Sequence, residues 1–346
     1  MAAYDQGTRD QAQRALSPDH YGDDARYAAE KENLFLKSWR LVGHENMLPD
    51  NGDFITDELA GAPILLVRGE DGEIRGFYNI CPHRAGPLAT ENTGNCGKEL
   101  TCRYHGWRFA LDGRLRSARD FGQSGGFDPR DLGLSQIELE TWRGFLFARR
   151  AAGGASVANL VAPVTANWPE QEIPPFALRR SHEIACDWKI YVENYLEGYH
   201  VPTLHPSLDA EIISADYHVE MRDNVAIHSA PSRDDAVYSG FWGWVFPWLG
   251  INIYQHGLMM ERMTPISANR TRLDYLYFFA PDREDDLQAM LELSDQVTAE
   301  DVRISEIVHR NVVSGAYAAG PLSPRHEGAV AWFQAQIRKL TPPVSP

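Results

Sequence analysis

Two short segments each pair one cysteine with one histidine. The first is Cys81-Pro82-His83 and the second is Cys102-Arg103-Tyr104-His105, with eighteen residues between them. Two thiolates can hold one iron of a [2Fe-2S] cluster while two imidazoles hold the other. Because imidazole is neutral, such a cluster accepts an electron more readily than a cluster with four thiolates. The sequence therefore predicts a site that handles single electrons.

A zinc site is the alternative for these four side chains. Zinc sites of the Cys2His2 kind usually place two cysteines in one arm and two histidines in the other, whereas each arm here has one of each. The arms resemble the C-x-H…C-x2-H signature of the Rieske non-haem iron oxygenases. The segment between them is slightly long for that family and contains Cys96. We interpret Cys96 as a loop thiol, with iron ligation as the weaker option.

A second group of reactive side chains follows further along the chain. Glu193, Glu197 and His200 stand at positions i, i+4 and i+7, so a helix would place them on one face. A continuous helix would turn His205 away, but Pro202 can end the helix and return this side chain toward His200. Two imidazoles and one carboxylate are the ligand set of non-haem Fe(II) oxygenases. We therefore expect both histidines to bind one metal ion.

The same segment resembles the iron-binding motif of Rieske oxygenase catalytic subunits, in the form Asn194-x2-Glu197-x2-His200-x4-His205. In the family, a carboxylate at the position of Glu197, often Asp, connects a Rieske histidine of one subunit to an iron-ligand histidine of its neighbour. A Glu there resembles the members that oxidise quaternary amines such as carnitine. The resemblance implies that Glu197 and Asn194 belong to the catalytic machinery. A surface salt bridge is the structural alternative for Glu197.

The third iron ligand is expected in an acidic pair. Glu300 and Asp301 precede the segment Val302 to Val313, whose apolar residues predict a helix. The family pattern places an Asp just before such a helix, so the resemblance favours Asp301 over Glu300. The complete expected set for a mononuclear Fe(II) is thus His200, His205 and Asp301.

Length and composition restrict the class of protein. A chain of 346 residues is too long for a small electron carrier and indicates two domains. The 33 basic and 48 acidic residues give a net charge of −15, which argues against nucleic acid or a membrane surface as partner. Few cysteines, no signal-peptide pattern and no long apolar run favour a cytoplasmic location.

The predicted fold class is α+β. Residues 1–38 should form an N-terminal helical segment that packs on the catalytic domain. From Asp24 to Trp39 the apolar positions Ala28, Leu34, Phe35 and Trp39 fit a helical pattern. Residues 39–150 should form a small antiparallel β Rieske domain. Residues 151–346 begin with an Ala/Gly-rich connection, Ala151 to Ala162, and for them the resemblance implies a helix-grip-like catalytic domain, an antiparallel sheet with flanking helices.

One hairpin is predicted directly within the small domain. The segments Ile64–Arg68 and Ile74–Tyr78 flank an Asp71-Gly72 turn, which is a typical hairpin signal.

The residues of the substrate pocket are less clearly indicated by the sequence than the metal ligands are. The aromatic run Phe241 to Trp248 could offer ring faces to a substrate or to a cation, although core packing is the favoured interpretation for most of these rings. Trp244, Asn252 and Gln255 are the candidate pocket residues, and the last two could orient a substrate through hydrogen bonds.

The resemblance also implies an assembly and a reaction. Electrons that pass between subunits require a ring-like homotrimer, and they must come from NAD(P)H through a separate flavin or iron-sulfur reductase, with or without a ferredoxin. The favoured hypothesis is a terminal oxygenase that hydroxylates or oxidatively demethylates a small organic substrate such as a quaternary or methylated amine. An aromatic-ring cis-dihydroxylating dioxygenase is the alternative. The iron motif argues against a mere electron carrier.

Overall fold

The computed structural model describes residues 13–122, 131–150, 153–165, 173–233, 236–238 and 240–340. The chain divides into a small unit, residues 34–160, and a large unit, residues 1–33 together with 161–346. The small unit begins at residue 34, before the expected boundary after residue 38, and it ends at residue 160, beyond the expected boundary after residue 150. Helix α2 (Val157–Thr165) occupies part of the segment that we expected to be a plain connection.

The small unit consists of three antiparallel sheets with strand orders β1-β10-β9, β4-β3-β2-β5 and β6-β7-β8. The expected hairpin is confirmed, because Leu65 of β3 lies opposite Phe77 of β4. A buried apolar cluster beneath the strands includes the side chains of Cys81 and Cys102. The strands are β1 (Arg40–His44), β2 (Asp53–Leu59), β3 (Ala62–Arg68), β4 (Ile74–Tyr78), β5 (Thr93–Asn95), β6 (Glu99–Thr101), β7 (Arg108–Ala110), β8 (Leu115–Ser117), β9 (Glu138–Trp142) and β10 (Phe145–Arg149).

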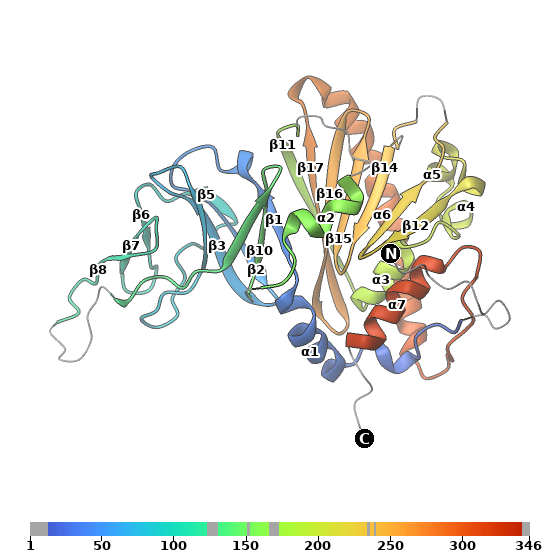
Figure 1. Cartoon of the computed structure of the whole chain (residues 1–346), viewed down its shortest axis with the longest axis horizontal. Helices are drawn as coiled ribbons and strands as arrows, with labels where there is room; N and C mark the ends of the chain where they lie inside the picture. Colours follow the sequence, from blue (N-terminus) through green and yellow to red (C-terminus); the bar gives the residue numbers. More distant parts are fainter. Residues whose placement is uncertain are drawn as a thin grey trace. The chain divides into compact units, whose positions relative to one another are not determined.

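The large unit contains one seven-stranded antiparallel sheet with the order β11-β17-β16-β15-β14-β13-β12, whose strands lie side by side in Figure 1. The interior strand β16 is buried over most of its length, as expected for a strand covered on both faces. The strands are β11 (Phe176–Ile184), β12 (His218–Arg222), β13 (Val225–Ser229), β14 (Gly240–Val245), β15 (Leu249–Tyr254), β16 (Gly257–Ser267) and β17 (Arg270–Phe279).

Helices α3 and α6 contact each other, and both contact the sheet. The expected start of α6 was wrong: the helix spans Glu284–Val312, so Glu300 and Asp301 lie well inside it. Acidic residues in its first turn, which favour a helix N-terminus, come much earlier in the sequence. No helix in the described ranges is long and apolar enough to span a membrane. The remaining helices are α1 (Asp24–Asn33), α3 (Trp188–Tyr195), α4 (Val201–Leu204), α5 (Pro206–Glu211) and α7 (Gly328–Leu340).

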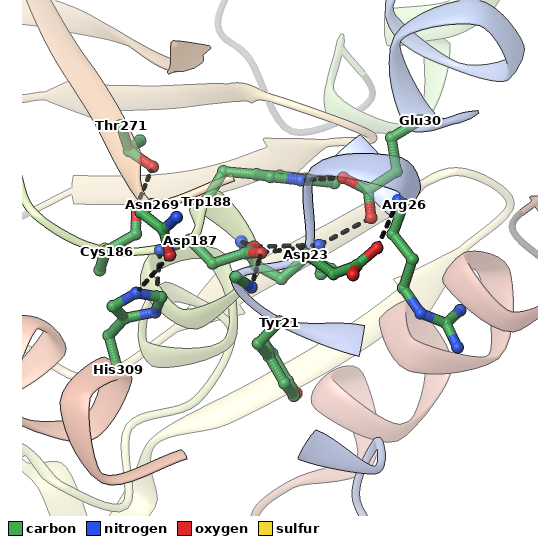
Figure 2. Close-up of polar contacts among 12 residues, drawn as sticks. Tyr21, Asp23, Arg26, Glu30, Cys186, Asp187, Trp188, Asn269, Thr271 and His309 are labelled. Atoms are coloured by element: carbon green, nitrogen blue, oxygen red, sulfur yellow. Dashed lines mark hydrogen bonds and ion pairs between the residues drawn. The ribbon is translucent and has the colours of Figure 1, made fainter. Parts of the chain in front are cut away.

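The N-terminal helix packs on the large unit through a polar face. It ends at Asn33 rather than at Trp39, and its buried residues are Arg26 and Glu30 while Ala28 is exposed. The other apolar positions of the expected segment, Leu34, Phe35 and Trp39, lie beyond this helix and are buried. Glu30 accepts a hydrogen bond from Trp188 Nε1 at 2.8 Å, at the start of α3 (Figure 2). It also accepts one from Lys189 Nζ at 2.7 Å. A buried lysine needs such partners, so these contacts anchor the helix that leads to the metal-binding segment.

Asp187 caps α3 and connects it to α6. Its side chain accepts from Lys189 N at 2.9 Å, while its own backbone N–H donates to His309 Nδ1 at 3.3 Å (Figure 2). An N-terminal cap of this kind stabilises a helix by roughly 1 kcal/mol. The start of α3 is therefore held by both α1 and α6.

Candidate functional site

The two Cys/His arms form equivalent loops of the small unit. Cys81 lies in the loop after β4, and Cys102 lies between β6 and β7. In each loop the cysteine carbonyl accepts from the residue four positions later, at 3.0 Å from Ala85 N and at 3.0 Å from Gly106 N. Both of these residues have positive φ, and Arg103 N donates to Pro87 O across the loops at 2.9 Å. The two loops are thus shaped alike and linked to each other.

The donor atoms of these loops fit an iron-sulfur cluster. Both cysteines are buried, and the rings of His83 and His105 lie 4.6 Å apart. The Nδ1 atom of His83 is buried without a hydrogen-bond partner, which is costly unless it binds something else. A Cβ placed on Gly86 would lie 2.8 Å from Cys102 Sγ, so a larger residue would crowd the thiol.

The electrostatics of the first arm also bear on iron binding. Burial raises the pKa of the Cys81 thiol to about 11, while backbone N–H groups of His83 and Arg84 act in the opposite direction. The thiolate form that binds iron therefore requires the charge of the metal. Cys96 is engaged elsewhere, because its Sγ donates to Gly52 O at 3.2 Å.

The expected iron ligands His200 and His205 are positioned by an early break in the helix. Helix α3 ends at Tyr195, so the expectation of a continuous helix to Pro202 was wrong. Glu197 accepts from the backbone N–H groups of Tyr199 and His200 and so stabilises a turn in place of helix. His205 then lies between the short helices α4 and α5. The chain reverses as expected, but the break begins before Glu197.

His200, His205 and Asp301 lie together in a geometry that can hold a metal ion. One ligand atom from each of the three lies within 4.8 Å of the others. Asp301 Oδ1 is 3.0 Å from His205 Nε2 and 3.9 Å from His200 Nε2. Two imidazoles and one carboxylate fit Fe(II), and the set leaves further coordination positions open.

Three polar residues hold these side chains in place. His200 Nδ1 lies 2.6 Å from Glu197 Oε1, and His205 Nδ1 lies 2.7 Å from Glu300 Oε2. With Nδ1 donating to a carboxylate, Nε2 of each ring is free to bind a metal. Asn194 Nδ2 donates to Asp301 Oδ1 at 2.7 Å.

Burial acts against the charged form of His205, but the hydrogen bonds and charges of Asp301 and Glu300 outweigh it and raise its pKa. The pocket between the helices and the sheet therefore concentrates negative charge around this imidazole, as expected where a cation binds.

A cavity of about 120 Å³ adjoins this site. Asn252 lines it and accepts from Tyr195 Oη at 3.1 Å. The other two pocket candidates do not line this cavity. Trp244 is fully buried, with its ring 5.7 Å from that of Phe333 on α7, and Gln255 is exposed in the turn after β15. Aromatic rings dominate the lining, with contributions from Tyr191, Tyr195, Tyr217, Tyr238, Trp242, Tyr254 and Tyr275.

Comparison with known proteins agrees with both centres. Residues 38–133 match the Rieske [2Fe-2S] domain, and residues 176–342 match the catalytic domain of the ring-hydroxylating alpha subunit. The chain is 32% identical to the carnitine monooxygenase oxygenase subunit of Escherichia coli K12, over 86% of this chain and 84% of that subunit. The chain belongs to the Rieske non-haem iron oxygenases. This Rieske oxygenase carries a [2Fe-2S] cluster and a mononuclear iron.

Other relatives of the oxygenase agree in family and fold. It is 28% identical to the chloroplastic choline monooxygenase of Arabidopsis thaliana, over 89% of this chain and 79% of that protein. The quaternary ammonium Rieske monooxygenase CntA in complex with L-carnitine superposes with a TM-score of 0.82 at 25% identity, covering 95% of this chain and 96% of that one. Naphthalene 1,2-dioxygenase from Rhodococcus sp. shares the fold at 16% identity, with a TM-score of 0.81 over 96% and 95% of the two chains.

Sequence patterns missed two carboxylates of the oxygenase. Glu300 was considered only as a rival ligand, yet its contact with Nδ1 makes it a positioning residue for His205. Glu261 of β16 lines the cavity, and the sequence gives no spacing signature for it because it is a single Glu in an apolar strand. The signal that could have revealed it is the strand pattern itself, since Glu is depleted in strands and seldom buried.

Proposed function

We propose that this Rieske oxygenase inserts one oxygen atom from O2 into a small methylated or quaternary amine and so hydroxylates or oxidatively demethylates it. The observation that carries the proposal is the aromatic cavity beside His200, His205 and Asp301, since ring faces attract ammonium groups. Relatives named for carnitine and choline oxidation support the same substrate class. The matching fold of naphthalene 1,2-dioxygenase does not favour ring dihydroxylation, because its identity is only 16%.

In this proposal Cys81 and Cys102 hold one iron of the cluster, and His83 and His105 hold the other. His200, His205 and Asp301 hold the mononuclear iron. The cluster supplies single electrons and the mononuclear iron activates O2 when both are bound. One oxygen atom enters a substrate C–H bond, and two electrons with two protons convert the other oxygen to water.

The side chains of this oxygenase orient and shield the reaction. Glu197 accepts the Nδ1 proton of His200 and, through its second oxygen, keeps the turn that presents this imidazole. Asn194 holds the carboxylate of Asp301 in one orientation. The buried aromatic lining excludes water from the substrate. These residues act by fixing geometry, which favours reaction of a bound substrate.

We further propose that Glu197 conducts electrons from a neighbouring subunit in a homotrimer. A structure of a quaternary ammonium Rieske monooxygenase has given insight into inter-subunit electron transfer in that protein, which supports this assembly. Electrons would come from NAD(P)H through a separate flavin or iron-sulfur reductase, with or without a ferredoxin. A cytoplasmic location stays a prediction.

Product analysis tests the proposal. The holoenzyme with a surrogate reductase, NADH and 18O2 would be given methylated amines, methoxy-arenes and plain arenes. We expect substrate-dependent NADH oxidation with a methylated amine and incorporation of one 18O atom, with formaldehyde released where the N-methyl group is attacked. A cis-diol containing two labelled oxygens from an arene, with no amine turnover, would refute it.

A further inference from the structure

Glu261 is a buried carboxyl group without a cationic partner. It is 3% exposed, on the interior strand β16, and its Oε1 accepts from Tyr191 Oη at 3.0 Å. Within the described ranges no Lys, Arg or His side chain forms an ion pair with it. A carboxylate in this position is costly unless a positive charge approaches it. Burial accordingly raises its pKa to about 8.

A second buried carboxylate, on the opposite face of the same sheet, is paired with cationic side chains. Asp274 is fully buried and lies 2.9 Å from Arg262 Nη2, 3.2 Å from Arg272 Nε and 2.5 Å from Arg179 Nη2. These arginines outweigh the effect of burial and hold the pKa of Asp274 far below its usual range. Glu261 has no such counter-charge from the chain, and it differs from Asp274 in lining the substrate cavity.

The other carboxylates that line the cavity are already engaged. Asp301 lies 3.0 Å from His205 Nε2, and Glu197 lies 2.6 Å from His200 Nδ1. Glu261 is the remaining carboxyl group among the described lining residues and can ionise against a bound cation, and none of those residues is Lys or Arg. The cavity can therefore neutralise a positive charge but offers no positive side chain to a carboxylate.

Aromatic rings complete a site for a cation. We call Tyr238, Trp242 and Tyr254 the aromatic corner; the ring of Tyr238 lies 6.5 Å from that of Trp242 and 5.6 Å from that of Tyr254. Burial raises the pKa values of Tyr238 and Tyr254, and the nearby charge of Glu261 raises them further. Ring faces together with a desolvated carboxylate are the recurring means of binding ammonium groups.

Two uncharged polar atoms of the lining residues have no partner. They are Tyr254 Oη and Nε2 of His228, and both are buried. Burial lowers the pKa of His228 to about 3, so its ring is neutral at physiological pH. Such atoms can pair with a neutral hydroxyl group on a substrate, but they cannot balance the charge of a carboxylate.

We propose that Glu261 binds the positive charge of the substrate, and that the substrate is a compact methylated ammonium compound that carries no carboxylate. This inference rests on the proposed function and deepens it. A cavity of about 120 Å³ agrees with a compact molecule, since sites for drug-sized ligands occupy roughly 300–1,000 Å³. The proposal separates choline-like cations from carnitine-like zwitterions.

Binding measurements on the iron-loaded holoenzyme under anaerobic conditions test this directly. The probes are choline, its uncharged isostere 3,3-dimethylbutan-1-ol and L-carnitine, studied by calorimetry without turnover. We expect wild type to bind choline at least tenfold more tightly than either other probe. Because loss of one partner of a buried charge pair costs about 2 kcal/mol or more, E261Q should bind choline at least 30-fold more weakly. Its affinity for the isostere should change less than threefold.

E220Q is the matched control, because it removes the same charge from an exposed position of β12 and should leave all three affinities unchanged. Unchanged choline affinity in E261Q would overturn the proposal, as would equal affinity of wild type for choline and its isostere or for choline and carnitine. The wild-type comparison stands even if E261Q fails to fold. Charge-selective binding without amine turnover would refute the proposed function alone, whereas amine turnover without charge selectivity would refute the role of Glu261 alone.

Discussion

Glu300→Gln should weaken the binding of mononuclear iron without removing the site. Glu300 Oε2 accepts the Nδ1 proton of His205 at 2.7 Å, and this contact fixes the ring so that Nε2 faces the metal. A charge-assisted hydrogen bond contributes about 1.5–3 kcal/mol and a neutral one about 0.5–1.5 kcal/mol. The loss of charge thus costs roughly 1–1.5 kcal/mol. Since the Glu300 side chain is 26% exposed, solvent screening favours the lower value.

The expected result is a Kd for Fe(II) about fivefold higher, because about 1 kcal/mol corresponds to that factor, just below the about 10- to 100-fold range for residues that orient a metal ligand. Anaerobic titration of iron-depleted protein measures it, with the visible spectrum of the [2Fe-2S] cluster as an internal standard. E292Q is the control, because it removes the same charge from an exposed position of α6. A Kd for E300Q within twofold of the wild-type value would refute the reasoning. Retention of iron by D301N combined with its loss in E300Q would make Glu300 the ligand instead.

Three further predictions concern the two centres and the sheet. His200→Ala should lose the mononuclear iron but keep the Rieske spectrum, as measured by metal analysis and paramagnetic resonance; loss of both would contradict independent sites. Glu197→Gln should retain both metals but turn over slowly, and steady-state activity equal to that of wild type would argue against the bridge. Asp274→Asn should lower the free energy of unfolding by about 3–5 kcal/mol in guanidinium, because it leaves three arginines without their counter-charge. Folding lowers the pKa of Asp274, so its carboxylate stabilises the folded state above pH about 4, and this stabilisation is lost as pH falls below that value. A difference in unfolding free energy between D274N and wild type that stayed unchanged at low pH would contradict this assignment.

The cluster site and the mononuclear iron site could be predicted largely from the spacing of residues along the chain. The Cys/His arms are loops of a few residues, so their ligands could be recognised from neighbours along the chain alone. The hairpin of β3 and β4 was likewise visible, because a turn and its flanking strands are contiguous. The convergence of His200 and His205 required only a break in the helix, which the sequence indicated at Pro202 and which the structure places earlier, after Tyr195.

The roles of Glu300 and Asp301 could not be assigned from spacing. Adjacent residues of a helix point in directions about 100° apart. On α6 this places Asp301 beside Nε2 of His205 and Glu300 beside Nδ1 of the same ring. Both carboxylates therefore act on one imidazole. Only the position of His205 relative to α6 decides which of them can reach a metal and which holds the ring.

The lining of the substrate cavity is determined by the pairing of strands that are distant in the sequence. Sequence patterns favoured Trp244 and Gln255, but the lining comes from Trp242 and from Glu261, which lies opposite Gly250 in the neighbouring strand. A Cβ on Gly250 would lie 3.2 Å from Cβ of Glu261, so the glycine makes room for the carboxyl group. The sequence by itself determined the cofactors, because all of their expected ligands except Asp301 lie in short segments of the chain. The tertiary structure alone decided the surroundings of the substrate, because sheet register brings together side chains that no local spacing connects.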